Sequence, residues 1–196
     1  MSNFGSMCLN GNLDQVRTFL SQDINVNMED PLGIFAGSTL LHFACNVGNV
    51  EVVKLLLEDK RVDVNVRNGK GETPFFLACL SGGVGVVKLM LKDERVDVNK
   101  ENVNGETPLI IAAGVGRVEI IKLMLISGRD VKLQHQDNRG RTALELAKRG
   151  KKDDIVDLLE KAINDPDYYR ILRKENRLTS MKNFLSFLFF FFLISI

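Results

Sequence analysis

A repeating unit of 34 residues limits the fold of this chain more than any other feature of its sequence. The tetrapeptide Gly-Glu-Thr-Pro occurs at residues 71–74 and returns at residues 105–108, a shift of 34 positions. The same shift aligns three alanines and three glycines: Ala44, Ala78 and Ala112, and Gly48, Gly82 and Gly116. A further copy begins at Thr142, and a shorter copy surrounds Cys8. We therefore expect five units between Met1 and about Ile163.

Each unit carries the signals of two helices and a projecting loop. Thr73 is a favourable N-cap, and Pro74 suits the first helical turn, where its missing N–H costs no hydrogen bond. Gly82 stands where a chain leaving a helix becomes left-handed, and apolar residues at i, i+3 and i+4 then predict a second helix. The unit closes on Val-Asp-Val-Asn and a turn rich in Asn and Gly, which we call a finger. One unit cannot bury its apolar face alone, so the units must stack.

The order of these motifs resembles the ankyrin repeat, in which Asp-x-x-Gly-x-Thr-Pro-Leu-His-x-Ala-Ala precedes a glycine turn, a Val-Val-x-Leu-Leu-Leu helix and Asp-Val-Asn. The resemblance covers about four-fifths of the chain. It implies an all-α ankyrin-repeat solenoid of about five stacked helix-turn-helix units with short hairpin fingers. The expected units are about 1–27, 28–65, 66–99, 100–133 and 134–163.

The chain departs from that signature at its histidine, which occurs only at His42. Phe76, Ile110 and Glu145 replace it in the other units. We therefore expect the hydrogen bonds between Thr and His to be missing from most of the stack, and packing to contribute more of the stability.

Charge and cysteine content exclude several classes of protein. Twenty-six Lys and Arg balance 25 Asp and Glu, so a net charge of +1 gives no general attraction to nucleic acid. Three widely spaced cysteines form neither a disulfide framework nor a zinc motif, which favours a reducing compartment. The first twenty residues lack the pattern of a signal peptide. We expect a cytoplasmic or nuclear protein that is monomeric.

Catalysis has few candidate residues. His42 and Cys45 lie three positions apart on one expected helix, as a base and a nucleophile could. Cys8, Cys45 and Cys79, however, occupy one repeat position that Ala113 fills in the next unit, which indicates a small buried side chain. The Gly-rich stretches at 82–85 and 114–116 fall at turns between helices and lack the Lys of a phosphate loop. We expect no enzyme, cofactor or metal; a small cysteine-dependent enzyme is the remote alternative.

The resemblance implies a scaffold or adaptor that binds another protein through its fingers and the exposed side of its inner helices. The polar residues at the finger tips are candidate contacts, and ordinary solvation is the alternative for each of them. They are Arg67, Lys70 and Glu72 in one finger, Lys100, Asn104 and Glu106 in the next, and Gln136, Asn138, Arg139 and Arg141 in the last.

The first long finger contains four extra residues, because Asn27 and Thr39 are twelve positions apart whereas Asn65 and Thr73 are eight apart. The insertion brings three apolar residues to a place where the other fingers are polar: Leu32, Ile34 and Phe35. They either anchor a partner or, in the case of Phe35, fold back to complete the core of the short first unit.

The C-terminal part breaks the pattern. A basic linker or helix at 164–183 precedes an apolar tail at 184–196. Thirteen helical residues span about 20 Å, less than the roughly 30 Å of membrane hydrocarbon. A full crossing is therefore not expected, but the basic residues before the tail suggest a shallow membrane insertion, so a membrane-tethered adaptor is the alternative function. Two other interpretations are that the tail covers the last repeat or is spurious sequence.

Gly85 predicts a weak third unit. It lies within an expected outer helix where Glu51 and Glu119 stand in the neighbouring units. Because glycine in a helix costs about 0.5–1 kcal/mol, we expect Gly85→Glu to stabilise the protein.

Overall fold

A computed structural model describes residues 4–9, 11–29, 37–165 and 167–168. These residues form ten α-helices and no strand, arranged in two rows as the repeat predicts. The inner row consists of α1 (Phe4–Leu9), α3 (Leu40–Val47), α5 (Pro74–Ser81), α7 (Pro108–Val115) and α9 (Ala143–Arg149). The outer row consists of α2 (Leu13–Ser21), α4 (Val50–Glu58), α6 (Val84–Met90), α8 (Val118–Ile126) and α10 (Asp153–Asn164).

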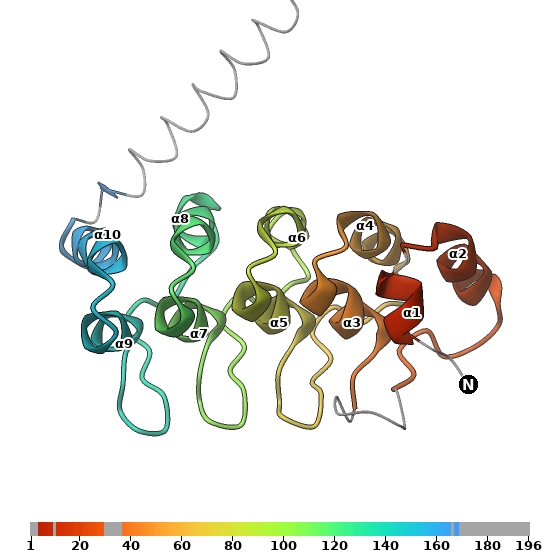
Figure 1. The fold of residues 1–196 in the computed structure, drawn as a ribbon, viewed down its shortest axis with the longest axis horizontal. Coiled ribbons are helices and arrows are strands. Elements are labelled where there is room, and N and C mark those ends of the chain that lie inside the picture. Colours follow the sequence, from red (N-terminus) through yellow and green to blue (C-terminus); the bar gives the residue numbers. More distant parts are fainter. Residues whose placement is uncertain (1–3, 10, 30–36, 166, 169–196) are drawn as a thin grey trace, which may run out of the picture.

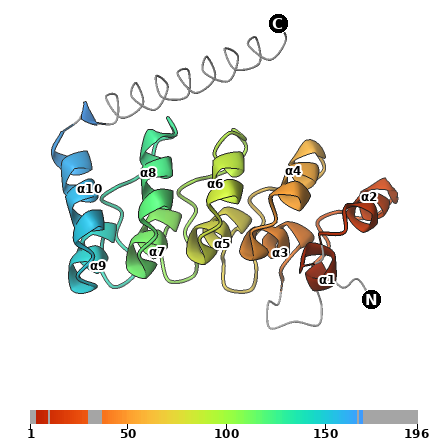
Figure 2. The ribbon, with the colours of Figure 1, turned by 45° about the horizontal axis from the view of Figure 1, so that its top comes forward.

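The two rows form an elongated stack in which each helix packs mainly on the next helix of its own row and on its partner in the same unit. Figures 1 and 2 show the fingers projecting from the inner row, on the side away from the outer helices. Each expected unit holds one pair of helices, although α10 continues to Asn164, one residue past the expected end. The expected all-α solenoid of stacked helix-turn-helix units is confirmed.

The inner helices begin as the Thr-Pro motif predicts. The hydroxyl oxygen of Thr73 accepts a hydrogen bond from the Phe76 amide at 3.2 Å, and Thr107 repeats this bond one unit later. In the last unit the Glu145 carboxylate also accepts from the Thr142 amide at 2.8 Å. Glu145 therefore closes the start of its helix at the position where the signature has histidine.

The three fingers that the structure describes in full are each closed by one buried polar residue: Asn68, Asn102 or Asp137. Asn68 Oδ1 accepts from the amides of Lys70 and Glu72 at 2.9 and 3.0 Å, and Asn102 makes the same contacts in the next finger. Adjacent tips are also joined, because the Val103 amide donates to the Lys70 carbonyl at 3.1 Å. These three fingers are thus rigid extensions of the stack.

A continuous apolar core runs between the two rows through all five units. At its N-terminal end the fully buried Phe4 ring contacts the rings of Phe19 and Phe43, with centroids 5.7 and 6.2 Å apart. The first unit therefore draws on an aromatic residue of its own inner helix for part of its core.

Two expectations from the sequence lie outside the described residues. Leu32, Ile34 and Phe35 belong to residues 30–36, and the tail belongs to residues 169–196. Their proposed roles stay predictions. Within the described ranges, no helix is both long enough and apolar enough to cross a membrane.

Candidate functional site

The exposed side of the inner helices carries a row of apolar side chains. Val47 and Val115 occupy equivalent positions on α3 and α7 and are 41% and 42% exposed. Leu80 of α5 and Ile111 of α7 are half-buried. Leu146 of α9 extends the row into the last unit, because its side chain lies close to Gly114 of α7. A Cβ atom added to Gly114 would be 3.6 Å from Leu146 Cδ1. We call this surface the inner-helix strip: Phe43, Val47, Leu80, Ile111, Val115 and Leu146.

A small hollow lies at the N-terminal end of the strip, between α3 and α5. It is lined by Ser38, His42, Phe43, Asn46 and Leu77. The Ser38 hydroxyl oxygen is buried, and it has no hydrogen-bond partner in the structure. One buried polar group without a hydrogen-bond partner therefore lies at this end of the strip.

The fingers place the polar candidates in two different situations. Glu72 accepts a bond from the Asn68 amide group at 2.9 Å, and Glu106 accepts one from Asn102 at 2.8 Å. Arg141 pairs with the buried Asp137 carboxylate at 2.6 Å. All three are half-buried and hold their fingers together. Their charges are thus less available to a partner than the sequence suggested.

The other candidates leave more of their side chains at the surface. Arg67, Lys70, Asn104, Asn138 and Arg139 are exposed, and Lys100 is half-buried. Arg67 donates to the Gly71 carbonyl at 3.1 Å, and Asn138 donates to the Val103 carbonyl at 3.1 Å. No described carboxylate forms a salt bridge with Lys70, Lys100 or Arg139.

A family model described as "Ankyrin repeats (3 copies)" matches residues 5–102 and 84–168, which is most of the chain. The chain belongs to the ankyrin-repeat family. A search of curated proteins found no match to it. Ankyrin repeats are in general modules of protein–protein interaction.

The cysteines of this ankyrin stack lie in its core. Cys8, Cys45 and Cys79 are fully buried, and the Cys45 thiol faces the Met90 sulfur at 3.4 Å. Burial raises the pKa of Cys8 to about 12 and also raises the pKa values of Cys45 and Cys79. Because the thiolate is the reactive form, these residues fit the packing role predicted for their repeat position.

His42 is a structural residue of the same core. The Thr39 amide donates to its Nδ1 at 3.1 Å, so the ring proton resides on Nε2, which donates to the Glu72 carbonyl at 3.0 Å. The second bond crosses to the next unit. Burial lowers the pKa of His42 to about 4, against smaller opposing contributions from hydrogen bonds to backbone groups. His42 is therefore neutral at pH 7.

The other histidine also crosses between ankyrin units, and no sequence motif predicts this contact. His135 contacts the Gly105 carbonyl at 3.1 Å and the Glu101 carboxylate at 3.0 Å. Its position, just before the last finger, lies outside the Thr-Pro-Leu-His motif, so no motif search finds it. In the described part of the chain, no group of three or more potential ligands could hold a metal ion.

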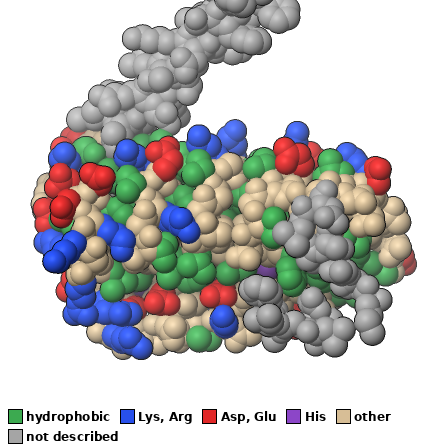
Figure 3. Space-filling model, in the orientation of Figure 1, with side chains coloured by type: hydrophobic (Ala, Val, Ile, Leu, Met, Phe, Trp, Pro, Cys, Tyr) green, Lys and Arg blue, Asp and Glu red, His purple; other side chains and the backbone are tan. Residues whose placement is uncertain are grey.

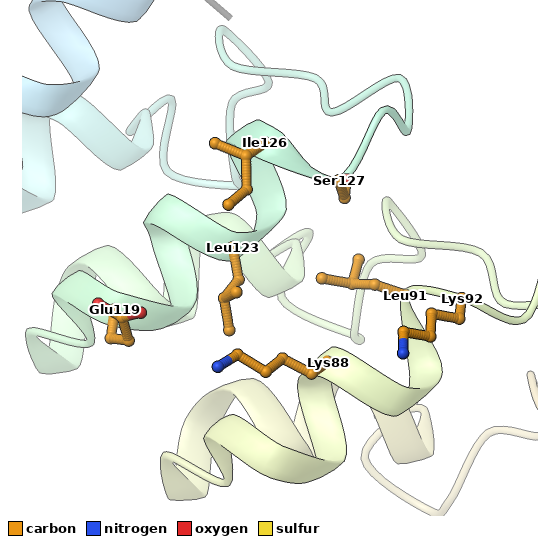
Figure 4. Close-up of a pocket in the computed structure, with 7 residues that line it drawn as sticks. All are labelled: Lys88, Leu91, Lys92, Glu119, Leu123, Ile126 and Ser127. Carbon is orange, nitrogen blue, oxygen red and sulfur yellow. The ribbon is translucent and has the colours of Figure 1, made fainter. Parts of the chain in front are cut away.

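A groove on the opposite, outer side of the ankyrin stack lies between α6 and α8 (Figure 4). Lys88, Leu91 and Lys92 form one wall, and Glu119, Leu123, Ile126 and Ser127 form the other. Figure 4 shows the aliphatic side chains between the two helices and the lysine ammonium groups at the rim. This groove offers apolar contact and positive charge, without a nucleophile paired to a base.

Proposed function

We propose that this ankyrin stack is a non-catalytic scaffold or adaptor that binds a partner protein through the inner-helix strip and the fingers. The observation that carries the proposal is the row of apolar side chains exposed on the inner helices. A contiguous apolar surface with polar edges is typical of protein-interaction sites on soluble proteins.

The fingers support this proposal through their rigidity. Their tips are joined by main-chain hydrogen bonds, such as the one from the Asn138 amide to the Asn104 carbonyl at 2.9 Å. Side chains on a preorganised surface lose less conformational entropy on binding than those on a mobile loop. Arg67, Lys70, Lys100, Asn104, Asn138 and Arg139 are thus suited to contact a partner at the edge of the strip.

The test is a quantitative capture experiment with the full chain as bait. Val47→Lys combined with Val115→Lys places charges on the strip at two exposed positions, where little folding stability should be lost. Ile126→Lys in the outer groove is the control substitution, and thermal unfolding of each bait verifies that it is folded. We expect proteins retained by the native chain and by Ile126→Lys to be lost from the strip variant. If the strip variant instead retains these proteins and Ile126→Lys loses them, the binding site is the outer groove.

A further inference from the structure

Charge is distributed unevenly along the inner side of the stack. Helices α1, α3, α5 and α7 contain no charged residue. Residues 134–152, which form the last finger, α9 and the following turn, contain six cations and two anions. The cations are Arg139, Arg141, Lys148, Arg149, Lys151 and Lys152, and the anions are Asp137 and Glu145. We call this group of six cations the basic end.

Three members of the basic end are engaged within the protein. Arg141 pairs with Asp137, Lys148 pairs with Glu160 at 2.7 Å, and the Lys152 ammonium donates to the Gly114 carbonyl at 2.6 Å. The other three, Arg139, Arg149 and Lys151, are exposed and form no salt bridge with a described residue. Figure 3 shows Lys and Arg side chains gathered over α9 and its finger.

The net charge of the chain conceals this uneven distribution of cations and anions. Helix α10, the partner of α9 in the outer row, carries four acids and one lysine. The unpaired cations of the last unit therefore lie on its finger and at the end of α9, and its acids lie mainly on α10, where Asp153 and Asp154 line one pocket together with Lys151 and Lys152. Because charges beyond a Debye length of roughly 8 Å are screened, a ligand on the inner side responds mainly to the nearer cations.

We infer that the segment bound by the inner-helix strip is apolar over α3 to α7 and acidic where it reaches α9, so that it lies along the stack in one direction. This inference rests on the proposed function and specifies the chemistry of its partner. Leu146 on α9 continues the apolar strip up to Arg149, so one extended segment meets both surfaces. Charge complementarity of this kind raises association rates and fixes the register of a complex. A nucleic acid would use the cations without using the strip.

The experiment selects ligands from a random peptide library displayed on phage, with the full chain as the target. We expect the enriched peptides to combine aliphatic or aromatic residues with Asp or Glu clustered toward one end. Enrichment of neutral or basic peptides, or of none, overturns the inference. A fluorescent single-stranded oligonucleotide is measured in parallel; if it binds more tightly than every enriched peptide, the basic end serves phosphate and the inference also fails.

Matched charge reversals then locate the acidic end of the bound peptide. Arg139→Glu combined with Arg149→Glu should weaken its binding about tenfold or more, and added salt should weaken binding to the native chain more than to this variant. Lys54→Glu combined with Lys122→Glu reverses two exposed charges on outer helices and should change affinity less than about twofold. Equal losses in both variants overturn the inference. If the strip variant loses captured partners while the basic-end variant retains them and binds peptides normally, the proposed function stands and only this inference falls.

Discussion

Asn65 joins its unit to the next through the backbone around Arg95: its Nδ2 donates to the Arg95 carbonyl at 2.7 Å. Its Oδ1 accepts from the Asp97 amide, also at 2.7 Å. Asn27 and Asn99 make the equivalent pair of bonds to the units that follow them. The last residue of the Val-Asp-Val-Asn motif is therefore a hydrogen-bonded link between neighbouring units, and this explains why it recurs with the repeat.

Removal of this link should weaken the stack. Asn65→Ala leaves a main-chain donor and a main-chain acceptor without their partner, so we expect the free energy of unfolding to fall by about 1–3 kcal/mol. Urea unfolding followed by circular dichroism measures the change. Asn46→Ala is the control, because the Asn46 side chain forms no hydrogen bond with a residue that the structure describes; it should change stability by less than about 0.5 kcal/mol. Equal losses in the two variants would mean that the Asn65 bonds contribute nothing net.

The left-handed turn after α9 provides a second prediction. Gly48, Gly82 and Gly116 end the three preceding inner helices with positive φ, and Lys151, with φ of 51°, takes their place in the last unit. A non-glycine residue in this conformation costs roughly 1 kcal/mol. Lys151→Gly should therefore raise the free energy of unfolding by about 0.5–1 kcal/mol, measured in urea. Lys161→Gly, within α10, should lower it by about the same amount; a loss in Lys151→Gly as well would show that the lysine side chain stabilises the turn.

The sequence predicted the fold well because the 34-residue shift repeats every part of the unit, from the Thr N-cap to the closing Asn. It predicted the candidate contacts less well. Glu72 and Glu106 look like free surface charges in the sequence, because their bonds to Asn68 and Asn102 exist only once the finger has closed. The basic end was equally hidden, since α10 cancels its charge in the composition.

His42 should make stability depend on pH in a defined window. Its pKa is about 4 in the folded protein, below the ordinary value of 6.5, so the unfolded chain binds the proton more tightly. Stability is then complete above about pH 6.5 and declines as the pH falls toward 4, by on the order of 3 kcal/mol at the lower limit. Urea unfolding at pH 7 and at pH 4.5 measures this decline.

The matched variant for His42 comes from the neighbouring unit, which has the buried Phe76 at the same position. His42→Phe should flatten the pH dependence between 4.5 and 7, whatever its effect on stability at pH 7. His135→Phe is the control and should leave most of the decline in place. A decline of unchanged size in His42→Phe would show that other groups produce it.

The cysteines provide a prediction about reactivity. Because burial raises the pKa of each thiol, iodoacetamide at pH 8 should label none of the three in the native protein within the time that fully labels them in urea. Mass spectrometry of intact protein counts the adducts. Rapid native labelling of Cys45 would restore the cysteine-dependent enzyme as a serious alternative.

Substitutions at Gly85 test whether the packing of α6 explains the glycine that the sequence predicts to weaken the third unit. The sequence favoured a stabilising replacement, since Glu51 and Glu119 occupy the equivalent position in the two neighbouring units. The structure places Gly85 inside α6, as expected, but a Cβ atom there would lie 2.7 Å from the Val50 Cγ2 atom. The gain in helix propensity, up to about 1 kcal/mol, is therefore opposed by contact with a β-branched side chain of limited rotamer freedom.

A double-mutant cycle separates these two effects. In a Val50→Ala background, Gly85→Ala should raise the free energy of unfolding by about 0.5–1 kcal/mol, because the opposing methyl group is gone. With Val50 present, the same substitution should gain at least about 0.5 kcal/mol less, and Gly85→Glu should follow Gly85→Ala in both backgrounds. Urea unfolding of the four proteins of the cycle gives the coupling energy. Equal gains in both backgrounds would mean that Val50 rotates away without cost, so that nothing in the packing of α4 against α6 requires glycine at this position.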